Sequence, residues 1–274
     1  MSMELPTYGI TDKSSSIKPY KMSSVPTTTK TTLWIWPNGL FPRRLIYYFR
    51  AKHITLSILK DHNINLVPVA LTTEPPALEA MQGYEARPSD SSLPILRITH
   101  TDGKEVWIRE SLSILSYFED LFPSTAGWPD LRGETPEGRA QTRDILSLLN
   151  DAMHWSLVCL INFDAKTTFW SGMKEEDMSS GVAEHAKGKW QFCLGRLEKW
   201  LQADVGKVVE RNSIAGVVLL AQVEYHEMMY GDWIEGHAVL REWVERMKGE
   251  AWYVESTGLK GVEEGIGWRA VLGN

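Results

Sequence analysis

The chain has 274 residues, 43% of them hydrophobic and 23% charged, and a formal net charge of -6 at pH 7. It is long enough to bury a sizeable core and to divide into two domains. The negative charge disfavours nucleic acid as a partner. We find no apolar run as long as a membrane span and no signal-like N-terminus, so we expect no membrane partner. The two cysteines, Cys159 and Cys193, lack CxxC spacing, which predicts a reducing, cytoplasmic setting.

Residues 1 to 30 are rich in Ser, Thr, Lys and Pro and show almost no apolar periodicity. Such a segment buries too little surface to offset the entropy lost on ordering, which predicts a disordered tail. A transit peptide is the alternative, weakened by the absence of any Arg before Arg43.

The chain changes character at Thr31. The short apolar run at 33–36 is followed by Pro37-Asn38-Gly39, which predicts a buried central strand that ends in a turn. Apolar residues then follow helical spacing from Phe41 to Phe49. Residues 64–71 form a second predicted strand, and Pro68 within it favours a position at the sheet edge because proline cannot donate to the ladder.

A peptide-binding platform is predicted between Leu93 and Pro123. Pro94 fits the start of a strand or a cis turn, and a cis bond would leave the N–H and C=O of Leu93 free for an extended ligand backbone. Asp102-Gly103 predicts a hairpin, and Glu110-Ser111 opens a helix whose unpaired N–H groups attract carboxylates. A free strand edge beside an anion-binding helix start favours a small acidic peptide as ligand.

Glycine and proline then concentrate at 124–138, which predicts a linker. Beyond it, apolar residues recur at intervals of three and four, which indicates an all-helical second domain. The predicted helices cover 139–163, 182–202, 213–230 and 237–248.

The run Leu93-Pro94-Ile95-Leu96, followed by 108–118, closely resembles the glutathione-binding half of glutathione S-transferases. Residues 212–215 and 240–247 are similar to later helices of that family, so the resemblance covers most of 31–256. It implies an α+β fold, with a thioredoxin-like βαβ-ββα domain at 31–123 and an all-helical substrate domain at 139–274. It also implies glutathione as co-substrate, no metal, and a homodimer.

The resemblance assigns roles to individual residues. Leu93, which precedes the cis-Pro of the family motif at Pro94, would pair with the cysteinyl backbone of glutathione, and Glu110 and Ser111 would hold its γ-glutamyl end. Pro94 and Leu40 are also assigned to the glutathione site. The alternative for Glu110-Ser111 is an ordinary helix start with a capping hydroxyl.

The family places a Tyr, Ser or Cys after the first strand to stabilise or replace the glutathione thiolate, and residues 36–44 contain none of these. The position falls at Gly39, or at Asn38 with a slip of one residue. The Asn38 amide can donate to a thiolate and lower its pKa, and otherwise Asn38-Gly39 is simply a turn pair. Arg43 and the backbone N–H groups of Gly39 and Leu40 are the next candidates.

Arg43 and Arg44 stand in the first helical turn, where cations oppose the helix dipole. This predicts a nearby anion, either the thiolate or the glycyl carboxylate of glutathione. Arg44 has a second interpretation, as a solvated or intersubunit side chain.

An apolar electrophile would occupy a pocket formed by Trp36, Phe41, His154 and Trp155. Aromatic residues at such spacing also pack in cores, and a lone His near apolar neighbours is often a packed residue.

The leading hypothesis is therefore a transferase that adds the glutathione thiolate to an apolar electrophile, similar to fungal transferases of secondary metabolism. The alternatives are a glutathione-dependent cis-trans isomerase and a glutathione-binding or regulatory protein without turnover.

Overall fold

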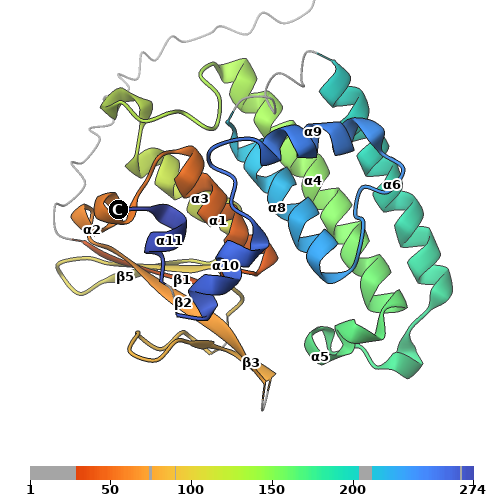
Figure 1. The fold of residues 1–274 in the computed structure, drawn as a ribbon, viewed down its shortest axis with the longest axis horizontal. Coiled ribbons are helices and arrows are strands. Elements are labelled where there is room, and N and C mark those ends of the chain that lie inside the picture. Colours follow the sequence, from red (N-terminus) through yellow and green to blue (C-terminus); the bar gives the residue numbers. More distant parts are fainter. Residues whose placement is uncertain (1–28, 74–75, 90, 204–211, 266) are drawn as a thin grey trace, which may run out of the picture.

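The computed structural model describes residues 29–73, 76–89, 91–203, 212–265 and 267–274. A sheet flanked by helices lies on one side of the molecule and a group of long helices on the other (Figure 1). The tail predicted at 1 to 30 lies outside the described residues except for its last two positions.

The sheet has five strands in the order β3-β2-β1-β4-β5. Strand β1 pairs in parallel with β2 and antiparallel with β4, so the prediction of a buried central strand is confirmed. The bounds are β1 Lys30–Ile35, β2 Ile64–Thr73, β3 Pro76–Ala80, β4 Ile95–Thr99 and β5 Glu105–Ile108.

The prediction that the strand at 64–71 lies at the sheet edge is wrong, because β3 pairs outside it from Val69 to Thr73. The carbonyl of Pro68 accepts from the Met81 N–H at 3.0 Å, one residue before that pairing starts. The N–H and C=O of one residue point to the same side of a strand. The missing N–H of Pro68 therefore lies at the end of the β3 ladder, where the sheet tolerates its loss.

The expected helix and hairpin form in the N-terminal part. Helix α1 covers Leu40–Ala51 and α3 covers Ser111–Leu121, while the six-residue α2, Leu56–Asp61, falls in a segment for which no helix was expected. The β4–β5 hairpin turns at Gly103, whose φ of +80° suits glycine.

A buried ion pair joins α1 to α3. Lys52 Nζ lies 2.8 Å from Glu119 Oε1, and both side chains are almost completely buried. The same ammonium donates to the carbonyl of Pro129 at 2.6 Å, so the ion pair also fixes the chain that leaves α3.

The four helices predicted for the second domain are confirmed. They are α4 Pro136–Phe163, α6 Ser180–Gln202, α8 Ile214–Met229 and α9 Ala238–Lys248. The short α5, Thr168–Ser171, follows α4, and the Ser213 hydroxyl accepts from the Gly216 N–H at 3.0 Å to cap α8. By length and composition α4 could cross a membrane, and in this structure it packs against α6 and α8.

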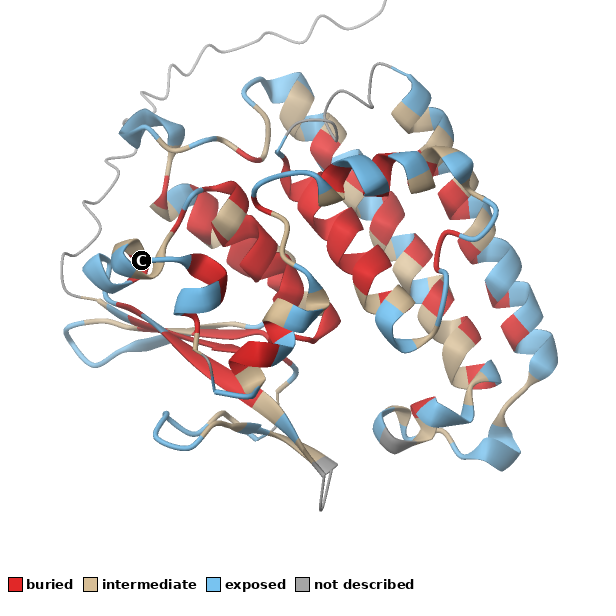
Figure 2. Cartoon of the chain, viewed as in Figure 1, coloured by how far each residue is buried: buried red, intermediate tan, exposed pale blue. Residues whose placement is uncertain are grey.

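The C-terminal segment returns to the sheet, as the dark blue ribbon of Figure 1 shows. It carries α10, Ser256–Glu263, and α11, Arg269–Leu272. The Arg50 guanidinium of α1 donates to four of its backbone carbonyls, those of Ala251, Trp252, Tyr253 and Val271. Both short helices bury one face there (Figure 2), which places residues near the chain end beside the start of α1.

Candidate functional site

Three predicted segments meet at one end of the sheet because of its strand directions. Trp34 pairs with Ile95, so the turn after β1 and the residues before β4 extend beyond the same end of this antiparallel pair. Leu96 pairs with Ile108, so β5 also ends there, and α3 starts three residues later. Leu93-Pro94, the turn at 36–39 and the start of α3 are thus neighbours in space.

The Leu93–Pro94 peptide bond is cis, one of the two arrangements that the sequence left open for Pro94. The Leu93 side chain is buried with Trp34, Val69 and Ile95 on the sheet face opposite α1. Within the described part of the chain, neither the N–H nor the C=O of Leu93 has a backbone hydrogen-bond partner.

The first backbone N–H groups of α3 have no partner within the helix. Glu110 precedes the helix in an extended conformation and makes no side-chain cap. The first bond of the helix runs from the Ile114 N–H to the Glu110 carbonyl at 2.9 Å, which leaves the N–H groups of residues 111 to 113 outside the helical ladder. Glu110 itself is exposed, and Ser111 is buried.

The interpretation of Arg44 as a solvated or intersubunit side chain is wrong, because only 2% of it is exposed. Its guanidinium donates to Ser111 Oγ at 3.3 Å and to Met153 Sδ at 3.3 Å, and it lies 4.9 Å from the centre of the Phe41 ring. Burial lowers the Arg44 pKa to about 10, while the charge of Glu110 raises it. Arg44 therefore keeps its positive charge at neutral pH, directly behind Ser111.

The turn after β1 meets the end of α10. Asn38 donates twice to Glu263 Oε1, from its side-chain Nδ2 at 2.6 Å and from its backbone N–H at 3.2 Å. Burial raises the pKa of Glu263, and the hydrogen bonds from Asn38 oppose that rise. The two donors of Asn38 thus form a small anion site, which a carboxylate of the same chain occupies.

Gly39 is required by its surroundings. A Cβ atom at this position would lie 2.7 Å from Cε3 of Trp36, closer than side chains approach one another. The Gly39 N–H donates to the Trp36 carbonyl at 2.9 Å, and the first helical bond of α1 runs from the Arg43 N–H to the Gly39 carbonyl. The N–H of Leu40, the first residue of α1, lies outside that ladder.

Arg43 is fully buried and links α1 to the second domain. It donates to Ser256 Oγ at 3.1 Å and to Met228 Sδ at 3.6 Å. Among the described residues no carboxylate lies within ion-pair distance of it, and its Nε lacks a hydrogen-bond partner. Arg43 therefore holds the start of α10 and the end of α8 against α1.

The four residues predicted to line an electrophile pocket fall into two groups. Trp36 and Phe41 lie at the turn and in the first turn of α1. Trp155 makes an edge contact with His185 of α6, and His154 is exposed beside it. The residue of α4 that reaches α1 is Met153, through Arg44.

Sequence reasoning missed Glu263, Met153, Ser256 and Met228. Each lies far along the chain from the turn, and no local pattern pointed to any of them.

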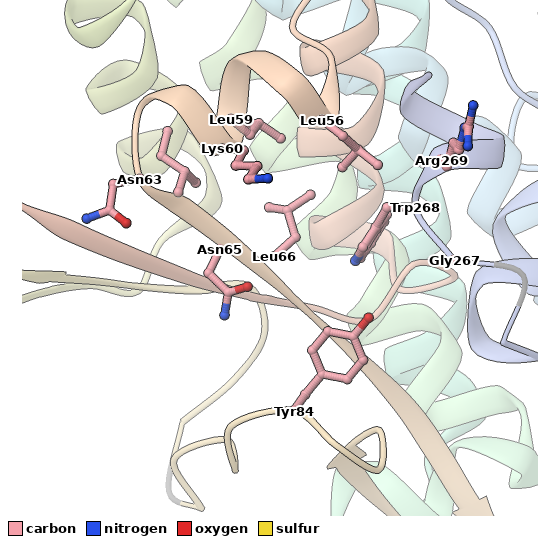
Figure 3. Close-up of a pocket in the computed structure, with 11 residues that line it drawn as sticks. Leu56, Leu59, Lys60, Asn63, Asn65, Leu66, Tyr84, Gly267, Trp268 and Arg269 are labelled. Carbon is pink, nitrogen blue, oxygen red and sulfur yellow. The ribbon is translucent and has the colours of Figure 1, made fainter. Parts of the chain in front are cut away.

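A cleft of about 470 Å³ lies elsewhere in the described structure (Figure 3). It opens between α2, β2 and the start of α11, and none of its eleven lining residues is among the predicted site residues. No group of three His, Cys, Asp or Glu in the described ranges could hold a metal ion. Burial raises the pKa of both cysteine thiols, which disfavours their thiolates.

No protein-family model matches the sequence, and no curated protein matches it. Solved structures match by shape. A glutathione S-transferase from Methylobacillus flagellatus with glutathione bound has 15% identity and a TM-score of 0.56, covering 81% of this chain and 96% of its own. A glutathione transferase from Populus trichocarpa has 16% identity and a TM-score of 0.57, with 86% and 99% covered. Gtt2 from Saccharomyces cerevisiae has 16% identity and a TM-score of 0.55, with 81% and 97% covered.

At this level of identity the similarity concerns the fold. The chain has the glutathione transferase fold, with a thioredoxin-like N-terminal domain followed by an all-helical C-terminal domain.

Proposed function

We propose that this protein binds glutathione at the end of the sheet where Leu93-Pro94, the turn at 36–39 and the start of α3 meet, and adds its thiolate to an apolar electrophile. The observation that carries the proposal is the convergence of these three segments. The structural neighbour from Methylobacillus flagellatus was crystallised with glutathione, which supports the choice of ligand.

The γ-glutamyl end is assigned to the start of α3. The Ser111 hydroxyl accepts from Arg44 and keeps its own hydrogen for a ligand carboxylate. The N–H groups of residues 111 to 113 lie at the positive, N-terminal end of the helix dipole. The positive charge of Arg44, which contacts Ser111, adds to that positive end. The exposed carboxylate of Glu110 suits the ligand ammonium.

The cysteinyl part is assigned to Leu93 and the turn. The N–H and C=O of Leu93 suit an extended ligand backbone, because they have no backbone partner in the described structure. The sulfur would then face Asn38, Gly39 and Leu40 at the start of α1. Arg43 is a positioning residue, since its contacts are with Ser256 and Met228.

We propose that the electrophile contacts two groups of residues, Trp36 with Phe41 and His154 with Trp155. Trp36 and Phe41 border the thiol position directly. Trp155 contacts α6, whereas the neighbouring Met153 contacts Arg44 of α1. His154 and Trp155 would therefore contact only a substrate that extends from α1 past Met153. The similarity to fungal transferases of secondary metabolism is the basis for an apolar metabolite as electrophile.

A binding protein without turnover is the second candidate, because Glu263 occupies both donors of Asn38 in the free chain. Retention on glutathione-agarose tests binding for both candidates. A thiol-dependent assay with a generic aryl halide then separates them, since only the enzyme gives turnover.

The test of the binding site is Ser111→Ala, with Ser116→Ala, an exposed serine further along the same helix, as control. Loss of one hydrogen bond to a charged group should weaken glutathione binding by about 1.5 to 3 kcal/mol, measured by titration calorimetry. Thermal unfolding of each variant checks that it is folded. An unchanged dissociation constant in folded Ser111→Ala would remove Ser111 from the site.

We also propose a homodimer, the assembly that the family resemblance implies and the commonest closed oligomer. Light scattering at micromolar concentration should give about twice the 31.1 kDa mass of the chain. A monomer at every concentration would contradict it.

A further inference from the structure

The carboxylate of Glu263 occupies the place at the turn where the proposed function needs a thiolate. Two N–H donors of Asn38 converge on the single atom Oε1, at 2.6 Å and 3.2 Å. A thiolate bound at the turn would compete for the same donors. Two neighbouring anions in a half-buried site repel each other, so one of them must carry a proton.

We propose that Glu263 is the base that accepts the thiol proton of glutathione, an inference that rests on the proposed function. The S–H bond breaks, the electron pair stays on sulfur, and a new O–H bond forms on the Glu263 carboxylate. The two hydrogen bonds of Asn38 pass from Oε1 to the sulfur. The charge of the site is -1 before and after the transfer, so no charge is added to the half-buried site.

The exchange of donors reduces the difference in pKa between the thiol and the Glu263 carboxyl. A free thiol has a pKa near 8.5 and a free carboxyl near 4.3, so in water the proton would stay on sulfur. Loss of the Asn38 hydrogen bonds raises the pKa of Glu263 further, because these bonds oppose the rise that burial causes. Gain of the same bonds lowers the pKa of the thiol, and the two values approach each other, as proton transfer requires.

The other charged groups near Glu263 do not replace it. On its own helix, Glu264 raises the Glu263 pKa by its charge and pairs with Lys260 at 3.3 Å. Of the elements that α10 contacts, strand β2 and the turn at 36–39 contain no charged side chain, and α11 contributes Arg269, which is exposed. Arg43 binds Ser256 at the opposite end of α10. Among the described residues, Glu263 is thus the carboxylate in direct contact with the turn.

The experiment measures how many protons leave the protein for each thiolate that forms. Titration calorimetry at pH 7 in two buffers of different ionisation enthalpy gives the protons released when glutathione binds. Near-ultraviolet absorbance of the same complex gives the thiolate formed. The wild type should form thiolate with almost no proton released, because Glu263 keeps the proton.

The variant Glu263→Gln keeps an oxygen that can accept from Asn38 but cannot take a proton. It should either form no thiolate at pH 7 or release about one proton for each thiolate. Glu255→Gln, an exposed residue at the other end of the same helix, is the matched control and should behave as the wild type does.

Release of about one proton per thiolate by the wild type would overturn the inference without any variant. Binding of glutathione without thiolate absorbance would also overturn the inference, although the proposal that the protein binds glutathione would then stand. If no protein in the series binds glutathione, the proposed function itself fails.

Discussion

Two neighbouring arginines at the start of α1 have lost nearly all contact with solvent. Arg43 is 0% and Arg44 is 2% exposed, and the Nε atom of each lacks a partner in the described structure. The sequence predicts cations here and an anion near them, but it cannot show burial, which depends on Ser256, Met228 and Met153 from distant helices. Arg44 is the one that the structure places behind a predicted ligand residue, Ser111.

The buried histidine of α8 gives a prediction at the residue scale. His226 is 3% exposed and stacks on Trp190 with a centroid distance of 5.7 Å and an interplanar angle of 7°. Burial lowers its pKa from 6.5 to about 4. Between these two values the unfolded chain binds more protons than the folded one, so the free energy of unfolding falls as pH falls from 6.5 to 4.

The loss attributable to His226 should reach about 3 kcal/mol at pH 4, at 1.36 kcal/mol for each pKa unit. His226→Phe should remove this part of the pH dependence, and the exposed His154→Phe should keep it. Urea unfolding at pH 7 and pH 4 measures both. Equal pH dependence in His226→Phe and the wild type would show that His226 is not held neutral.

At the scale of elements, the sequence predicts the segments that have long apolar periodicity or a distinctive turn. The strands at 33–36 and 64–71, the Asp102-Gly103 hairpin and four long helices are found. Several short elements were not predicted, and three of them show why. Strand β3, Pro76–Ala80, has no β-branched residue, α2 has six residues, and α10 contains Gly258 and Gly261. Tertiary packing stabilises all three, and their sequences do not reveal it.

The prediction of the site is limited in the same way, because contacts between distant segments leave no local pattern. Leu93-Pro94 and Glu110-Ser111 could be located because turn chemistry and strand direction bring them together. Glu263 could not, because the low helix propensity of α10 gives no sign that its end meets Asn38.

The Lys52–Glu119 ion pair tests the packing of α1 on α3. Lys52→Met would remove the closest charged partner of the buried Glu119 carboxylate, which keeps weaker contacts with the Leu131 N–H at 3.3 Å and with Arg132 at 3.6 Å. Breaking a buried pair from one side costs about 3 to 5 kcal/mol of unfolding free energy. Removal of the exposed Lys260–Glu264 pair by Lys260→Met should cost less than about 1 kcal/mol.

Denaturant unfolding compares the two variants. Adding Glu119→Gln to Lys52→Met should recover part of the loss, because the unpaired charge is removed. Similar losses in Lys52→Met and Lys260→Met would mean that the buried ion pair does not stabilise the fold.

For the whole molecule, the return of the C-terminal segment is the feature that connects fold and site. Arg50 binds four of its carbonyls, Arg43 binds Ser256, and Asn38 binds Glu263, all from the start or middle of the N-terminal domain. The turn that would activate the thiol is therefore held by a residue 225 positions further along the chain, Glu263. Part of the helical half thus belongs structurally to the sheet domain.

The central claim is that glutathione binds where the turn, Leu93 and the start of α3 meet. A crystal structure of the wild-type protein with glutathione bound tests it most directly. The account predicts the γ-glutamyl carboxylate at Ser111, the cysteinyl backbone paired with Leu93, and the sulfur within hydrogen-bond distance of Asn38. Glutathione bound at any other place, including the cleft of Figure 3, or absent at saturating concentration, would contradict it.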